Sequence, residues 1–279
     1  MKQLLMGVSL AALTAPAFAA DPIVYVEEPM VVAQRSPFSG HIEAYLGGLN
    51  ISEGGDDETY LVYGGTGRLN WAINDRWNLQ GDVFYDNIDT DEIGGSISGL
   101  GGAVHAYWRN PDSFAVGVWG SYSGFEVGST SQDVDQYRVG PEFQIYAGNW
   151  TIYGQGYYGQ LDLGPAEADL WGARGVVRYF AHENLRFDGE IGYHTLGAGG
   201  QNIDTLTLAL QANYRFAGTP LTVFGRYQYD MLSGNVASLD ADLHKFVIGV
   251  RGSFGSNSLL DEDRYGATMD TPRNNIIVY

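Results

Sequence analysis

The sequence predicts an all-β protein, a transmembrane antiparallel up-and-down β-barrel of about 12 strands. Three observations lead to this fold class: long segments in which apolar and polar residues alternate, an even number of such segments, and basic residues confined to one face of the strands. Alternation with a period of two is typical of a strand whose two faces meet different surroundings. Bacterial single-chain barrels have an even number of strands.

Residues 1–20 have the layout of a secretory signal peptide. Lys2 precedes a short apolar stretch and a small-residue end, so we expect cleavage after Ala19 or Ala20. The apolar stretch is too short to span a hydrocarbon core of about 30 Å, which argues against a membrane anchor. Residues 21–37 are acidic and flanked by prolines, and we interpret them as a periplasmic linker.

The composition excludes several classes of protein. The chain has no cysteine, which excludes disulfides, thiolate metal sites and cysteine nucleophiles. Its 39 glycines and 19 tyrosines suit many strands joined by tight turns and argue against long helices. A net charge of −18 argues against nucleic acid as a partner. No apolar run after residue 20 is long enough for a helical membrane span.

The strands and their connections follow one another in a regular order. Residues typical of turns occur around Asn74, Pro111, Gly148, Glu183 and Gly218, which predicts short turns at one end of the barrel. Longer loops are expected at the other end, at 50–58, 86–96, 123–133, 162–169, 195–204 and 231–242, with 16 acidic and no basic residues. The predicted strands are 38–49, 59–73, 77–85, 97–109, 114–122, 134–147, 150–161, 170–180, 185–194, 205–216, 221–230 and 243–254.

Charge and aromatic residues are sorted between the two faces. The apolar positions define a lipid face, and a charge there costs about 2–4 kcal/mol at mid-depth. Ten basic residues within strands all fall on the opposite face: Arg68, Arg109, Arg138, Arg174, Arg178, Arg186, Arg215, Arg226, Lys245 and Arg251. A soluble β-sandwich would alternate too, but it has no reason to sort aromatic residues by depth. An interface belt is predicted near the short turns, formed by Trp71, Trp77, Trp108, Trp150, Tyr179 and Phe254.

The opposite face predicts a charged lumen. Counting back from the tight turns places Arg68 opposite Asp82 and Arg178 opposite Asp188, so that opposite charges attract across the strands. One interpretation is a constriction that sorts small solutes; the other is a polar core that closes the barrel. The predicted constriction contains Glu43, Arg68, Asp82, Glu142, Arg174, Arg178, Asp188, Glu190, Arg226 and Arg251.

No catalytic, cofactor or metal site is predicted. The five histidines lack a nearby serine along their strands and lack the spacing of metal ligands. We interpret them as isolated residues of the wall or the turns. Because a site assembled from distant strands would leave no spacing signal, a membrane enzyme stays as a distant alternative.

Several features resemble the porin-like outer-membrane proteins of Gram-negative bacteria. These are the exported start Ala20-Asp21-Pro22, the glycine- and tyrosine-rich alternation over 38–254, and a closing strand that ends on Phe254. The resemblance implies a barrel in the bacterial outer membrane, in contact with lipid, lipopolysaccharide and the barrel assembly machinery. It also implies passive passage of small hydrophilic solutes. The alternative is a structural or surface-interaction barrel without a conducting pore.

The chain departs from this family after the closing strand. Residues 255–279 follow Phe254, whereas members of the family usually end there. This tail could carry the assembly signal, occupy the lumen or extend into the periplasm. The sequence leaves these three alternatives open.

Overall fold

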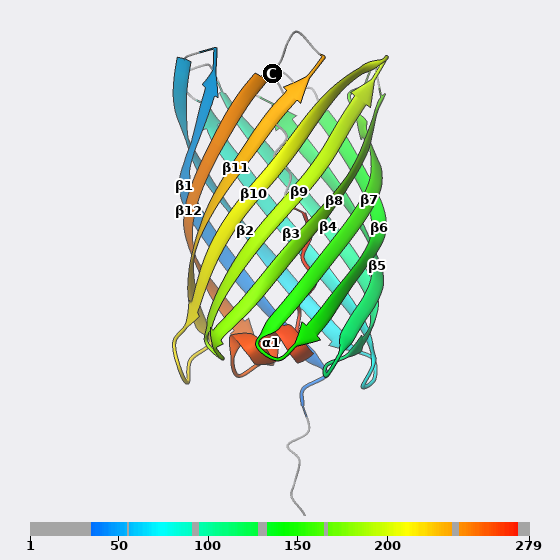
Figure 1. The fold of residues 1–279 in the computed structure, drawn as a ribbon, viewed down its shortest axis with the longest axis vertical. Coiled ribbons are helices and arrows are strands. Elements are labelled where there is room, and N and C mark those ends of the chain that lie inside the picture. Colours follow the sequence, from blue (N-terminus) through cyan, green and yellow to red (C-terminus); the bar gives the residue numbers. More distant parts are fainter. Residues whose placement is uncertain are drawn as a thin grey trace, which may run out of the picture. The chain divides into compact units, whose positions relative to one another are not determined.

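The computed structural model describes residues 35–54, 56–90, 95–127, 133–164, 167–235 and 240–272. They form a closed barrel of 12 antiparallel strands followed by a short helix, which confirms the predicted fold class (Figure 1). The predicted signal peptide and most of the predicted linker lie outside the described residues. The strands are β1 (Phe38–Glu53), β2 (Asp56–Ala72), β3 (Trp77–Thr90), β4 (Gly95–Asn110), β5 (Phe114–Val127), β6 (Asp133–Ala147), β7 (Trp150–Asp162), β8 (Glu167–His182), β9 (Leu185–Ala198), β10 (Gln201–Arg215), β11 (Leu221–Gly234) and β12 (Asp240–Phe254), and the helix is α1 (Leu259–Tyr265).

Each strand pairs with its neighbours in the sequence, and β1 pairs with β12 to close the barrel. Closure pairs Gly40 with Phe254 and continues to Glu53 opposite Ala241. A closed barrel leaves no unpaired strand edge, which is what a β-sheet in lipid requires. No helix within the described ranges is long and apolar enough to cross a membrane.

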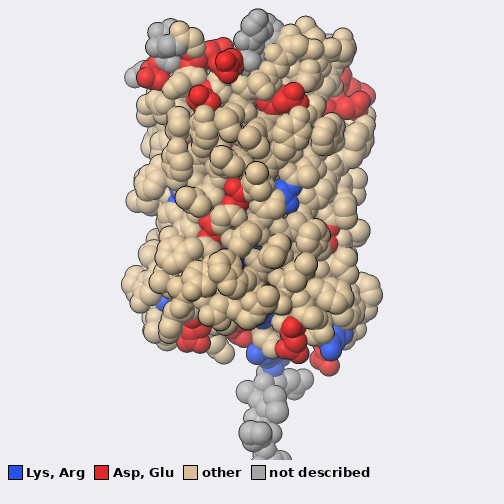
Figure 2. Space-filling view, viewed as in Figure 1, with Lys and Arg blue, Asp and Glu red and all other residues tan. Residues whose placement is uncertain are grey.

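The expected difference in loop length between the two ends is wrong. The strands continue into the segments that we interpreted as loops, so that Glu53 of β1 still pairs with Asp56 of β2. The extra pairs are stabilised by ladder hydrogen bonds and by side-chain bonds such as Asn50 to Thr59. Because the strand ends far from α1 carry these polar residues, acidic side chains gather near that end of the wall in Figure 2. Polar composition was therefore a poor signal for where these strands end.

The outer surface of the wall is apolar. Leu46, Val104 and Leu210 are all more than half exposed although they are fully apolar, as a lipid-facing surface requires. The aromatic residues of the predicted belt lie on this surface beside the turns at the α1 end, where Trp77 pairs with Trp108 and Trp150 with Tyr179. Their role at a membrane interface stays a prediction.

The outer surface changes character toward the end far from α1. There, tyrosines on one strand donate hydrogen bonds to aspartates on the next strand in four successive hairpins. The pairs are Tyr122–Asp135 at 2.7 Å, Tyr158–Asp169 at 2.6 Å, Tyr193–Asp204 at 2.9 Å and Tyr229–Asp242 at 2.7 Å. A ring of amphipathic tyrosines tied to carboxylates suits the edge of a membrane rather than its centre.

After β12 the chain turns back into the barrel. Gly255 has a φ of +73°, and a Cβ there would lie 2.4 Å from the carbonyl oxygen of Phe38, so the turn requires glycine. Ser258 caps α1 by accepting a hydrogen bond from the backbone N–H of Asp261 at 3.0 Å. The helix lies across one end of the barrel, and the chain beyond it runs inside the lumen (Figure 1). We call residues 255–272 the luminal segment.

Candidate functional site

The lumen is the candidate site, and the luminal segment occupies the half of it nearest α1. We call this part the α1 half. Here the carboxylate of Glu262 faces His41 at 3.2 Å, Arg215 at 3.5 Å and Arg251 at 3.6 Å. Burial alone would raise the pKa of Glu262, but His41 and Arg251 outweigh it and hold the pKa well below its usual range. Basic side chains from strands on both sides of the β1–β12 seam thus bind the helix through Glu262.

The next two residues bind the opposite wall. Asp263 pairs with Arg178 at 2.7 Å and accepts a hydrogen bond from Thr151 at 2.6 Å. Arg264 donates to the carbonyl oxygens of Gly148 and Trp150, and so ties the helix to the turn between β6 and β7. Burial raises the pKa of Asp263, but Arg178 and Arg264 reverse that effect and lower it.

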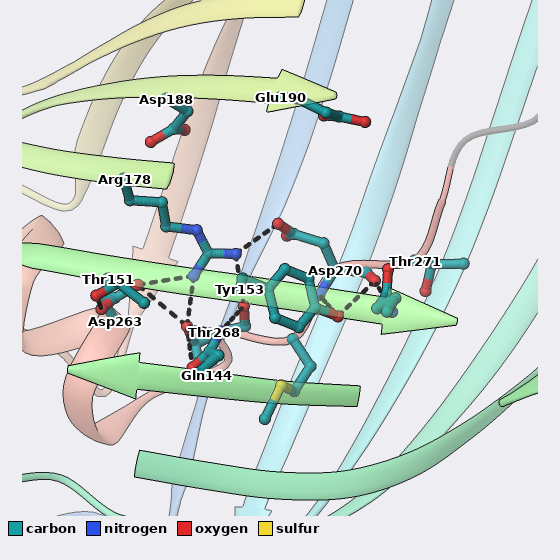
Figure 3. A network of polar contacts seen from close by, with 12 residues as sticks. Gln144, Thr151, Tyr153, Arg178, Asp188, Glu190, Asp263, Thr268, Asp270 and Thr271 are labelled. Atoms are coloured by element: carbon teal, nitrogen blue, oxygen red, sulfur yellow. Dashed lines mark hydrogen bonds and ion pairs between the residues drawn. The ribbon is translucent and has the colours of Figure 1, made fainter. Parts of the chain in front are cut away.

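Farther along the luminal segment, one carboxylate binds three arginines. Asp270 lies 2.5 Å from Arg178, as Figure 3 shows, and it lies 2.9 Å from Arg68 and 3.7 Å from Arg174. Burial would raise the pKa of Asp270, but the three guanidinium groups together hold it well below its usual range. Arg178 lies between Asp263 and Asp270 and joins the helix to the extended part of the segment.

The backbone of the luminal segment is also satisfied by side chains of the wall. Gln80 donates to the carbonyl oxygen of Met269 at 2.7 Å and accepts from its N–H at 3.2 Å. Arg109 binds the carbonyl oxygens of Tyr265 and Gly266 at 2.7 and 2.8 Å. An extended segment has no internal partners for these groups, so the wall must supply them. The Met269 side chain is fully buried in a cluster with Tyr107, Tyr146 and Tyr153.

His105 takes part in a second polar cluster. It lies 3.0 Å from Glu142 and 3.1 Å from the hydroxyl of Thr271, which also donates to Asp82 at 2.9 Å. The interpretation of the histidines as isolated is wrong for His105, and also for His41, which faces Glu262. The partners of His105 come from β3, β6 and the luminal segment, so no spacing in the sequence could have brought them together.

The structure places the residues of the predicted constriction on the inner wall, but the luminal segment changes their partners. Arg68 pairs with Asp82 at 3.1 Å, as the register suggested. Arg178 lies opposite Asp188 in the register, yet its guanidinium binds the luminal segment, and Asp188 pairs with Arg186 at 2.9 Å instead. The remaining pairs are Arg174–Glu190 at 3.6 Å, Arg226–Glu190 at 3.0 Å and Arg251–Glu43 at 2.8 Å. Whether these residues form a constriction for solutes stays a prediction.

Beside and beyond the luminal segment the lumen contains a chamber of about 580 Å³. We call the part of the lumen beyond Asp270 and Pro272 the far half. The chamber lining runs from Arg186 and Arg251 near α1, past Asp270 and Pro272, to Glu53 at the end of β1. The chamber combines arginines with apolar side chains such as Leu161 and Val247. The described residues contain no group of three or more side chains arranged to hold a metal ion.

Comparisons with known proteins support the fold. No family model and no curated protein matches the sequence. An outer membrane channel from Pseudomonas putida F1 is similar with a TM-score of 0.60 and 13% identity, over 80% of this chain and 97% of that one. The KdgM porin in complex with disordered oligogalacturonate has a TM-score of 0.47 and 9% identity, over 75% of this chain and 99% of that one. OmpT, an outer membrane protein of Vibrio cholerae, has a TM-score of 0.46 and 16% identity, over 78% of this chain and 97% of that one.

The likeness and the wall lead to the same conclusion. The likeness to the Pseudomonas channel extends over almost all of that protein, and at this identity it concerns the fold. The wall of this chain is closed, apolar outside and charged inside, which is the arrangement that a barrel in lipid needs. The chain is therefore a β-barrel protein of the bacterial outer membrane, with a fold like that of the Pseudomonas channel.

Proposed function

We propose that the chain is a channel for small hydrophilic solutes that its own luminal segment closes. The observation that carries this proposal is a polar chamber that the luminal segment borders with Asp270, Thr271 and Pro272, while the segment and α1 occupy part of the lumen at the α1 end. On this proposal a solute crosses the α1 half when the segment moves aside. We place the α1 end in the periplasm, because the exported chain enters β1 at that end.

The way in which the segment is held supports a movable plug. Most of its contacts are hydrogen bonds and ion pairs, and in water each of these groups can be solvated instead, so the net gain per hydrogen bond is about 0.5–1.5 kcal/mol. Its apolar contacts centre on Leu259 and Met269. A plug held mainly by polar contacts can leave the wall without exposing a large apolar surface.

Reversible cross-linking of the full-length chain tests the proposal. Gln144 and Thr268 face each other, with 3.1 Å between Nε2 and Oγ1. In Gln144→Cys with Thr268→Cys the two thiols are the only ones in the chain, because the natural sequence has no cysteine. A short bis-thiol reagent with a reducible link should fix the segment. Single-channel currents in planar bilayers should appear for the uncross-linked pair, disappear on cross-linking and return with reductant.

The control is the single variant Thr268→Cys treated with the same reagent, which should keep conducting. Currents that persist in the cross-linked pair would show that the path does not involve the luminal segment. A second function, a structural barrel without a pore, is favoured by the ion pairs that hold the luminal segment to the wall in the α1 half. Folded wild-type protein that never conducts would establish that function and contradict the channel.

A further inference from the structure

The far half contains an arginine without an acidic partner. Arg138 of β6 is only 5% exposed and makes no ion pair within the described residues. Its guanidinium donates to the hydroxyl of Ser121 and to the carbonyl oxygen of Pro272, both at 3.2 Å. A guanidinium has five N–H groups, so three of them are left for another acceptor. A buried cation of this kind is costly unless an anion joins it.

A second arginine beside it is only loosely held. Arg174 of β8 reaches Glu190 at 3.6 Å and Asp270 at 3.7 Å, both beyond hydrogen-bond length. Its buried Nε has no hydrogen-bond partner within the described residues. Tyr157 of β7 lies on the strand between Arg138 and Arg174, with its ring centroid 5.8 Å from the Arg138 guanidinium. The two arginines therefore lie on the strands that flank β7, and both line the chamber together with Tyr157.

The chamber wall next to this pair is apolar. Leu161 of β7 lies opposite Gln136, one inward position from Arg138, and belongs to a buried cluster with Phe125, Val134 and Ala168. Binding pockets for small molecules commonly join such an apolar wall to a few polar groups that fix the orientation of the ligand. The chamber volume of about 580 Å³ lies within the range of such pockets.

The luminal segment already shows that this wall binds a carboxylate. Asp270 brings its carboxylate to Arg68, Arg174 and Arg178 at the boundary of the chamber. Arginines that bind one carboxylate from the chain offer the same chemistry to a carboxylate on a solute. Unlike the three arginines that bind Asp270, Arg138 forms no ion pair with a carboxylate of the described residues.

We propose that Arg138 and Arg174 bind the carboxylate of a small organic anion whose apolar body packs against Leu161 and its neighbours. This site rests on the proposed function, because it would hold a solute on its way through the lumen. A carboxylate that draws Arg174 toward Arg138 would also take it from Asp270. Binding would thus remove one of the three arginines that hold the luminal segment.

Calorimetric titration of the full-length barrel in detergent tests the site without requiring conduction. The probes are benzoate, its uncharged analogue benzamide, and acetate, which lacks the apolar body. Benzoate should bind at least about tenfold more tightly than either of the others, since each lacks one half of the recognition. Arg138→Gln should weaken benzoate binding at least about tenfold, and Arg138→Lys should restore part of it.

Lys245→Gln is the matched control for loss of one positive charge. Lys245 also lines the chamber, but from β12, which is six strands away from β6 around the 12-stranded barrel. The Lys245→Gln variant should change benzoate affinity by less than about threefold, because charges at that separation are largely screened. Equal binding of benzoate and benzamide, no benzoate binding, or equal losses in Arg138→Gln and Lys245→Gln would overturn the proposal. If benzoate binds to a barrel that never conducts, the anion site stands and the proposed channel function is contradicted. If the barrel conducts but does not bind benzoate, the channel function stands and the anion site is contradicted.

Discussion

The two halves of the lumen carry similar side chains on the wall but differ in what fills them. In the α1 half, Arg178, Arg215 and Arg251 face the acids of the luminal segment. In the far half, a chamber remains, and Arg138 faces it without a carboxylate. Twelve strands enclose more space than wall side chains fill by themselves. Buried charges on the wall of a lumen need partners of opposite charge. In this barrel the luminal segment supplies such partners in the α1 half.

Removing the arginine at the centre of the α1 half should have the largest effect. Arg178→Met leaves Asp263 buried with Arg264 alone and takes the shortest ion pair from Asp270. Breaking a buried pair by removing one partner costs about 3–5 kcal/mol, so the luminal segment should dissociate from the wall far more often. The measurement is the rate of thiol labelling at Met269→Cys, a buried position, at fixed pH.

The matched change in the far half is Arg226→Met. Arg226 pairs with Glu190, but Glu190 keeps Arg174 as a second partner, and neither contacts α1. Labelling at Met269→Cys should therefore rise little. Equal increases in the two variants would mean that the two halves do not differ in how they hold the segment.

A smaller effect is expected at the turn that directs the chain into the α1 half. Gly255→Ala adds a Cβ that would lie 2.4 Å from the Phe38 carbonyl oxygen, at a positive φ, and should weaken docking by about 1–3 kcal/mol. Gly218→Ala is the control, since Gly218 has a φ of +71° but no atom within 4 Å of the added Cβ. If both variants raise labelling at Met269→Cys equally, backbone strain alone explains the effect and the contact with Phe38 does not matter.

The wall could be predicted from the sequence because the face and the register of each strand depend on residues close together in the chain. Side chains alternate along a strand, so the apolar residues fix which face meets lipid, and tight turns fix the register that pairs Arg68 with Asp82. The ends of the strands far from α1 could not be predicted in this way. Acidic residues such as Asp57 and Glu58 satisfy a loop and a water-facing strand equally well, and pairing across the hairpin decided between them.

The luminal segment could not be placed from the sequence, because its contacts join residues more than 100 positions apart, such as Gln144 and Thr268. One signal was present. The inward positions near the short turns hold Arg178, Arg186 and Arg251 against a single acid, Asp188. A buried surplus of positive charge requires anions from elsewhere. The acids of the segment that follows β12 meet that need, and the sequence alone did not show that they would come from there.

The smallest expected effect is the response of the plug to mild acid. Glu262, Asp263 and Asp270 all have pKa values below their usual range in the docked segment, where burial is outweighed by the neighbouring cations. Groups of this kind stabilise docking fully above their undocked pKa, which is about 4, and lose that contribution only as the pH falls through the docked values. The open probability of wild-type channels in planar bilayers should therefore stay constant between about pH 8 and 5 and rise below about pH 4. A transition near pH 6 would contradict this and assign the docking free energy to His41 or His105, which contact Glu262 and Thr271.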